Sequence, residues 1–309
     1  MTNTVKTGAT SAAESTTDVL AGGTGEAEVK SASQWRDIRR RFVANKLAVV
    51  GLVLVGILFL TAIFAPLIAP YDPYEQDLMN TLAPSSADHL AGTDALGRDV
   101  FSRVVYGARI AVIIGLASML LSSILGIVLG SIAGYFGNKT DSIVMRIADI
   151  FFAFPLLIGA IVIILLTGRG VFPVVLSIAI FGWATTARLL RSSILSTREA
   201  DYVMAAKALG ADTKRIVLRH VLPNSIAPVI VYATTSVAGA LVAAASLSFL
   251  GVGVSPEVPE WGNLISNARD FVGIQDIFWV APSIGVIIAC LGFIFVGDGM
   301  RDALDPKLR

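Results

Sequence analysis

The sequence predicts an all-α membrane protein with six transmembrane helices. The chain of 309 residues is 55% hydrophobic and 15% charged, with a mean hydropathy of +0.74, which is too apolar for an ordinary soluble domain. A helix needs about 20 apolar residues to cross a hydrocarbon core about 30 Å thick. Six segments approach that length, at residues 47–69, 110–134, 150–167, 171–187, 226–251 and 277–297.

A polar region precedes the first span. Residues 1–33 are rich in Thr, Ala, Ser, Gly and Glu and have almost no large apolar side chains, a composition typical of disorder. An amphipathic segment then leads into the first span, so residues 34–70 form the next part of the predicted organisation. Because the first apolar run starts only at residue 47, we do not expect a signal peptide.

Several residues within the spans indicate how the helices pack. Only a few residues around Arg169 separate the third and fourth spans, which predicts a tight hairpin, and Pro155 is expected to kink the third span. Arg146 and Asp149 share a helix face, and we interpret them as an interfacial anchor rather than a gating pair. Small residues at every fourth position favour close packing inside the bundle over a second subunit or a pore wall. They are Ser118, Ser122, Gly126, Gly130 and Gly134 on the second span, and Ser236, Ala240, Ala244 and Ser248 on the fifth.

The distribution of lysine and arginine predicts the orientation in the membrane. With both termini in the cytoplasm, sixteen of these residues lie on the cytoplasmic side and five on the other side. This is the bias expected for cytoplasmic loops. It places residues 71–109 and 252–276 outside the cytoplasm. The core of residues 110–297 then carries a cytoplasmic loop at 199–224, and residues 298–309 form a cytoplasmic tail.

Residues 199–224 form an island of charge between two long apolar segments. The pattern predicts two short helices, with Gly210 breaking the first and Pro223 ending the second. Small side chains beside a glycine let another surface approach the backbone closely. Such an island suits a docking site for a soluble protein, and the alternative is an ordinary amphipathic loop. The residues at helical spacing are Tyr202, Ala205, Ala206, Leu209 and Ile216.

The sequence offers no pattern for catalysis, so we predict no catalytic, metal-binding or cofactor-binding residues. His89 and His220 fall on opposite sides of the predicted membrane, and the single cysteine, Cys290, excludes a multi-cysteine metal site. No G-x-x-x-x-G-K-[ST] phosphate loop occurs. The net charge of +1 argues against nucleic acid as a partner. No series of ionisable residues crosses the spans, which disfavours a self-sufficient secondary transporter.

Seven motifs in order along residues 35–309 carry a family resemblance. They are WRDIRRRFVANKLAVVGL, APLIAPYDP, HLAGTDALGRDVFSRVVYGAR, MRIADIFFAFP, YVMAAKALGADTKRIVLRHVLPN, ASLSFLGVGVSPEVPEWGNLI and GDGMRDALDPKLR. The chain resembles the permease subunits of ABC importers for dipeptides, oligopeptides and, in some members, nickel, and most of all their C-type permease. The cytoplasmic EAA signature of that family falls on residues 199–224. Met204 stands where the family usually has glutamate, which removes the basis for a salt bridge there.

The resemblance implies a transport mechanism and a set of partners. In this family the EAA segment is a coupling helix seated on an ATP-binding subunit, and ATP-driven closure of two such subunits moves two permeases between inward- and outward-open states. The implied partners are a second, B-type permease, one or two ATP-binding subunits that hydrolyse the ATP, an extracytoplasmic binding protein and the peptide. The implied coupling residues are Tyr202, Ala205, Ala206, Gly210, Ala211, Leu222 and Pro223.

The expected function is therefore that of a multi-pass permease in the cell membrane, which forms a peptide path with its partner permease. A nickel or glutathione importer is the alternative within the family, and a secondary transporter is the alternative outside it. Two further motifs, GTDALGRD at residues 92–99 and SPEVPEWG at residues 255–262, either contact the binding protein or the partner permease, or form a structured cap over the bundle.

Overall fold

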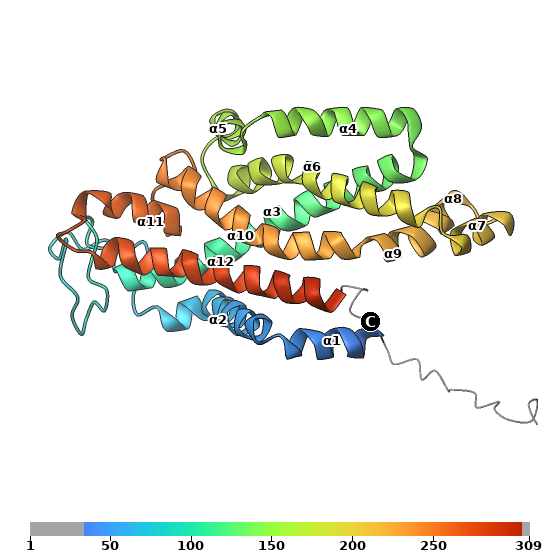
Figure 1. Cartoon of the computed structure of the whole chain (residues 1–309). Helices are drawn as coiled ribbons and strands as arrows, with labels where there is room; N and C mark the ends of the chain where they lie inside the picture. The colour runs from blue at the N-terminus through green and yellow to red at the C-terminus, as the bar shows by residue number, and fades with distance from the viewer. Residues whose placement is uncertain (1–33, 305–309) are drawn as a thin grey trace, which may run out of the picture. The chain divides into compact units, whose positions relative to one another are not determined.

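The predicted all-helical architecture is confirmed in the computed structural model, which describes residues 34–304 (Figure 1). Within these residues no strand forms, and the only bridge joins Thr93 and Asp99. Residues from Ile38 onward belong to one compact folding unit. The predicted disorder of residues 1–33 and the last five residues of the tail lie outside the described residues.

Six helices lie between residues 34 and 197, and the first of them, α1, is short and amphipathic. Ile38 and Phe42 are half-buried on one face of α1, as the amphipathic pattern predicts. The elements are α1 (Gln34–Ala44), α2 (Lys46–Ile68), α3 (Val100–Phe136), α4 (Asn138–Ala153), α5 (Leu156–Thr167) and α6 (Val171–Thr197).

The second half alternates short elements with two long helices. The elements are α7 (Asp201–Ala208), α8 (Thr213–Ile216), a π-helical turn η1 (Val217–Val221), α9 (Leu222–Ser225), α10 (Ala227–Phe249), α11 (Trp261–Ala268), a 3-10 turn η2 (Arg269–Phe271) and α12 (Ile277–Leu304).

Within residues 34–304, five helices are long and apolar enough to cross a membrane, namely α2, α3, α6, α10 and α12. The third predicted span differs from expectation. Instead of one kinked helix over residues 150–167, α4 and α5 meet at an angle of 92° and together make the sixth candidate span. The break lies at Phe154 and Pro155, both in extended conformation, because proline disfavours helical geometry in the residue before it and cannot donate a backbone hydrogen bond.

Two helices extend well beyond their apolar runs. α3 begins at Val100, ten residues before the predicted span, because the side chain of Asp99 caps it by accepting a hydrogen bond from the Ser102 amide at 2.7 Å. Its first turns therefore lie inside the predicted loop 71–109. α12 likewise continues to Leu304, past the predicted end of the span at residue 297.

The glycines of the α3 stripe pack inside the bundle, as predicted. A Cβ atom added to Gly130 would lie 2.7 Å from the carbonyl oxygen of Ala187, and one added to Gly134 would lie 2.9 Å from Ile194. The backbones of α3 and α6 thus approach too closely for any larger residue at these positions. On α10, Ala240 is buried against residues of α3, α5 and α6.

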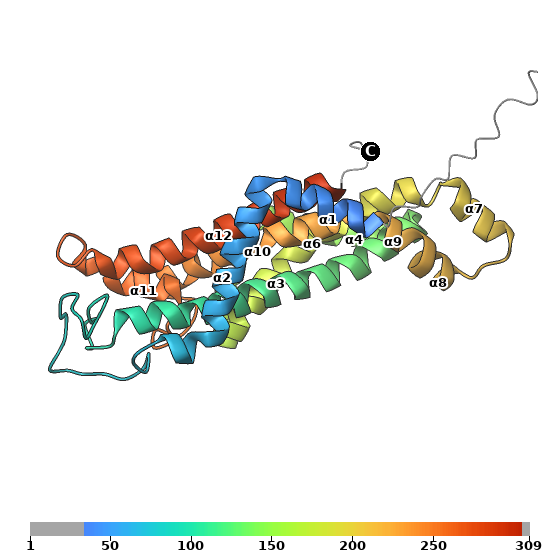
Figure 2. The same cartoon turned by 90° about the horizontal axis from the view of Figure 1, so that it is seen from below.

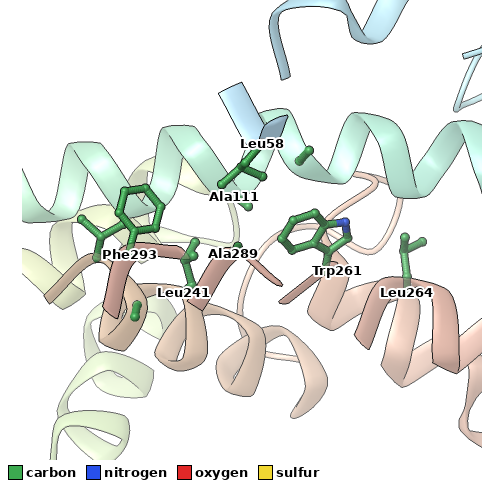
Figure 3. Close-up of a cluster of buried hydrophobic side chains, with 10 residues drawn as sticks. Leu58, Ala111, Leu241, Trp261, Leu264, Ala289 and Phe293 are labelled. Carbon is green, nitrogen blue, oxygen red and sulfur yellow. The ribbon is translucent and has the colours of Figure 1, made fainter. Parts of the chain in front are cut away.

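A buried cluster joins α2, α3, α10 and α12 to α11 (Figure 3). Trp261, at the start of α11, inserts its indole ring among these helices and donates a hydrogen bond to the carbonyl oxygen of Val104 at 3.0 Å. Leu58, Leu241 and Phe293 belong to the same cluster and come from three of the spanning helices. α11 is therefore fixed to the bundle by core packing.

The two loop-rich regions lie at opposite ends of the bundle. In both views α7 and α8 lie at one end, whereas α11 and the long connection between α2 and α3 lie at the other (Figures 1 and 2). This separation agrees with the predicted placement of residues 199–224 on one side of the membrane and of residues 71–109 and 252–276 on the other.

Candidate functional site

The coupling segment predicted at residues 199–224 forms two helices, as expected. The first is α7, and the second starts at Thr213 and continues through the π-helical turn η1 into α9. Leu222 and Pro223 open α9, and Leu222 closes the wide turn by donating its amide to the carbonyl oxygen of Val217. Because Pro223 has no N–H group, the backbone cannot continue regular α-helical bonding through this point.

Gly210 ends α7 through its backbone conformation. Its φ of +80° lies in the left-handed region, and its amide donates to the carbonyl oxygen of Lys207 at 3.0 Å while the Ala211 amide donates to that of Ala206 at 3.1 Å. This pair of bonds is a Schellman motif, which favours glycine at the left-handed position. The space around the Gly210 Cα is open, so the requirement here is conformational rather than steric.

α7 is exposed around most of its circumference, and Val203 is its one buried residue. Val203 is fully buried, whereas Tyr202 is 46% exposed and Leu209 89% exposed. Ala205 is exposed on the same side as Tyr202 and Ala206 is half-buried. The spaced apolar residues that predicted the helix therefore form its free face, and one valine anchors the other face.

Val203 joins the coupling segment to the spanning helices. It packs in a cluster of residues with less than 3% exposure, and Ala211 and Leu222 flank this cluster. The sequence pattern did not reveal Val203, because eight residues contain only about two helical turns and too few positions to define a period. The buried members of the cluster are Leu190, Ile194, Val203, Ile216, Val221 and Val229.

Polar contacts fix the helix ends beneath the coupling segment. The Arg198 guanidinium donates to the carbonyl oxygen of Gly134 at 3.0 Å, and Arg191 forms a two-bond ion pair with Asp141. Arg188 binds Asp149 at 2.7 Å. Asp149 therefore pairs across helices, and Arg146, its predicted neighbour on the same face, is exposed. These bonds join α3, α4 and α6.

At the other end, the connection between α2 and α3 and the segment after α10 form a folded cap, here called the loop cap (residues 71–99 and 252–276). Arg103 is fully buried beneath it and donates to the carbonyl oxygen of Pro73 at 2.8 Å. Arg98, also buried, binds the Asp94 carboxylate at 2.8 Å. Asp94 and Arg98 of the GTDALGRD motif thus form an ion pair within the first segment of the cap, which favours the structural interpretation of that motif.

The SPEVPEWG motif is also part of the loop cap. Glu260 is 5% exposed and caps α11 by accepting a hydrogen bond from the Asn263 amide at 3.0 Å. Burial raises the pKa of the Glu260 carboxyl above its ordinary value, although hydrogen bonds from the Gly262 and Asn263 amides and from Ser248 oppose the shift. Sequence reasoning placed this motif correctly but did not identify its buried residues.

The two histidines lie at opposite ends of the unit, as the topology predicted. His89 in the loop cap contacts Asp99 at 3.0 Å, whereas His220 lies in η1. Across residues 34–304, no three of the His, Cys, Asp and Glu side chains gather in a way that would hold a metal ion.

Comparison with known proteins identifies the family. Residues 126–309 match the family of binding-protein-dependent transport system inner membrane components. Residues 33–84 match the N-terminal transmembrane domain of oligopeptide transport permease C. The chain belongs to the binding-protein-dependent transport permeases. This permease is therefore a multi-pass inner-membrane component of a transport system, and its five or six apolar helices agree with that assignment.

Relatives of the permease share almost its whole length. It is 41% identical to the oligopeptide transport system permease protein OppC of Bacillus subtilis over 91% of this chain and 92% of that protein. It is 42% identical to the dipeptide transport system permease protein DppC of Alkalihalophilus pseudofirmus over 92% and 93% of the two chains. Identity to the glutathione transport system permease protein GsiD of Pectobacterium atrosepticum is 39% over 89% and 92%.

Proposed function

We propose that this permease is the C-type membrane subunit of an ATP-driven, binding-protein-dependent importer of di- and oligopeptides. The observation that carries the proposal is the free apolar face of α7, a short helix anchored by Val203 at one end of a membrane bundle. Exposed apolar side chains on a rigid, charged segment outside the spans are typical of a protein-docking surface. The peptide cargo follows from the relatives, two of which are named as oligopeptide and dipeptide permeases.

In this proposal α7 is the lever on which an ATP-binding subunit acts. Tyr202 and Ala205 contact that subunit, and the small side chains of Ala205 and Ala206 let it approach the helix backbone. Met204 is exposed on the opposite side of α7 from Tyr202, so it takes no part in this contact and offers no salt bridge. ATP is hydrolysed on one or two separate subunits. Movement of α7 then reaches α6 and α10 through the Val203 cluster.

The remaining partners take the other surfaces of the bundle. A second, B-type permease completes the translocation path, and an extracytoplasmic binding protein delivers the peptide at the end that carries the loop cap. Both termini then lie in the cytoplasm, as the lysine and arginine bias predicts. Leu78 and Met79, at 68% and 92% exposure, present apolar surface on the loop cap for one of these partners.

The test is uptake in a strain that lacks only this chain. Labelled dipeptides, tripeptides, glutathione and nickel ions are compared before and after complementation. We expect the intact gene to restore peptide uptake and Gly210→Trp to abolish it, because an aromatic side chain in the left-handed turn disrupts the docking surface. Gly210→Asn is the matched control, since asparagine tolerates this conformation.

Each outcome distinguishes one part of the proposal. Loss of glutathione or nickel uptake alone assigns the chain to that alternative cargo. Full peptide uptake by Gly210→Trp, together with normal copurification of the ATP-binding subunit, refutes the coupling role of the segment. If uptake of all four cargoes is unchanged in the deletion strain, the importer proposal is wrong.

A further inference from the structure

A cavity of about 360 Å³ lies among the spanning helices, away from both the coupling segment and the loop cap. Its wall comes from α3, α6 and α10, which run together through the bundle (Figure 1), and from Leu156 at the start of α5. Ser118, Gly182 and Gly239 lie near the midpoints of α3, α6 and α10. The cavity is therefore near the middle of the membrane.

The wall is mainly apolar and carries no charge. Among the described residues, no acidic or basic side chain, histidine or cysteine lines the cavity, whereas five residues with hydroxyl groups do. Three of them donate to carbonyl oxygens of their own helices: Ser122 to Met119 at 3.1 Å, Thr235 to Tyr232 at 3.0 Å and Ser236 to Ala233 at 2.8 Å. Each of these hydroxyl oxygens can still accept a hydrogen bond from another donor. The five residues are Ser118, Ser122, Tyr232, Thr235 and Ser236.

Ser118 differs from the other hydroxyl residues. It is 1% exposed, and its hydroxyl has no hydrogen-bond partner among the described residues. A buried hydroxyl is normally satisfied, and an exception calls for a reason such as a missing ligand. Ser118 therefore carries an unsatisfied hydroxyl at the wall of the cavity, and its neighbours enclose that hydroxyl in this conformation.

The break between α4 and α5 provides a second, independent observation. Irregular backbone at membrane depth is tolerated where it is buried in protein or lines a cavity. In transporters, discontinuous helices form substrate sites near the bilayer midplane. Phe154 and Pro155 interrupt the helix immediately before Leu156, which lines this cavity.

We propose that this cavity is the surface of the translocation path that contacts the peptide backbone. The inference rests on the proposed peptide cargo and deepens it. A peptide that crosses the membrane interior must replace the hydrogen bonds that water makes to its N–H and C=O groups. Neutral hydroxyl groups can both donate and accept such hydrogen bonds, and they do so whatever the charge of the peptide's side chains. A nickel ion would instead need imidazole, thiolate or carboxylate ligands, and none lines this wall.

Gly239 offers a way to fill the cavity without disturbing the fold. It lines the wall and is exposed, and an added Cβ atom would have no neighbour within 4 Å. Gly56 on α2 has equally open surroundings but lies outside the cavity. Gly239→Leu and Gly56→Leu therefore introduce the same side chain into a spanning helix. We expect the first to reduce peptide uptake and the second to leave it unchanged.

The experiment measures uptake of labelled tri-alanine in cells and binding-protein-stimulated ATP hydrolysis by the purified whole transporter. Gly239→Leu is expected to reduce uptake by about tenfold or more, as an intruding side chain does in a fitted site, with ATP hydrolysis and subunit copurification retained. Gly56→Leu keeps wild-type uptake. Ser118→Ala lowers the maximal uptake rate by about two- to tenfold, the effect of one lost hydrogen bond.

Wild-type uptake by Gly239→Leu overturns the inference and leaves the proposed function intact. Loss of copurification in that variant also overturns it, because Gly239 then lies at a subunit contact. Absence of tri-alanine uptake by the wild type refutes the peptide cargo and this inference together. A second variant avoids the larger side chain: in a Cys290→Ser background, Gly239→Cys should react with a small methanethiosulfonate, and tri-alanine should slow the reaction. No protection by tri-alanine contradicts the proposal.

Discussion

Replacing Val203 with alanine is expected to release the coupling segment from the bundle without changing its docking face. Val203 is fully buried and packs against Leu190, Ile194 and Val229. The substitution removes two buried methyl groups at about 0.8 kcal/mol each and leaves a cavity, so the local cost is about 2–3 kcal/mol. A helix of eight residues is not stable by itself in water. The helical conformation of α7 therefore depends on the packing of Val203.

Hydrogen exchange by the purified transporter in lipid discs measures the effect directly. A loss of about 2 kcal/mol corresponds to about a 30-fold increase in the open population, so amides in α7 should exchange about 30-fold faster while those of α3 remain unchanged. Val242→Ala, at a valine with 52% exposure on α10, is the matched control. Peptide uptake should fall with Val203→Ala although Tyr202 and Ala205 are intact.

An unchanged exchange rate in α7 would show that partners or lipid, rather than Val203, hold the helix, and the lever mechanism would lose its structural basis. Faster exchange with full uptake would refute the requirement for a rigid lever instead.

Three further predictions concern the packing and polar contacts. Gly130→Ala should lower the stability by about 1–3 kcal/mol, because its Cβ would lie 2.7 Å from the Ala187 carbonyl oxygen; thermal unfolding beside Gly56→Ala measures this, and equal melting temperatures would contradict it. Since burial raises the pKa of Glu260, the folded cap binds its proton more tightly than the unfolded chain, so the stability contributed by this group is highest at acidic pH and falls as the pH rises through the raised pKa. Glu260→Gln should remove that part of the pH dependence in exchange measurements on α11, and an unchanged slope would count against it. Asp141→Asn should lower the stability by about 1 kcal/mol, because the ion pair of Asp141 with Arg191 is partly exposed. Faster hydrogen exchange in α4 would support this value, with Asp298→Asn as the control that leaves the exchange unchanged.

The coupling segment illustrates how far local patterns reach. Gly210 correctly separated the two helices of residues 199–224, because a left-handed turn acts within a few residues. The prediction that Pro223 ends the second helix was wrong, because Pro223 lies in the first turn of α9, where its missing N–H group is tolerated. The same pattern did not reveal that Val203 is the anchor. Which face of a two-turn helix is buried depends on residues of α6 and α10 that are distant in sequence.

The spans show the same division. Apolar length predicted the regions of α2, α3, α6, α10 and α12, and small residues at every fourth position predicted the close approach of α3 to α6. For the third span, Pro155 predicted a kink, whereas the structure has two helices, α4 and α5, at an angle of 92°.

Composition and interactions between near neighbours in the chain were enough to predict the fold class, five of the spans and the helix break at Gly210. The three-dimensional packing was needed to show that Arg103 is buried beneath the loop cap against the Pro73 carbonyl, that Trp261 fixes α11 to the bundle, and that hydroxyl-bearing residues of α3 and α10 line one cavity. These contacts join residues far apart in the sequence, and helix rotation, which no local pattern specifies, decides which side chains meet.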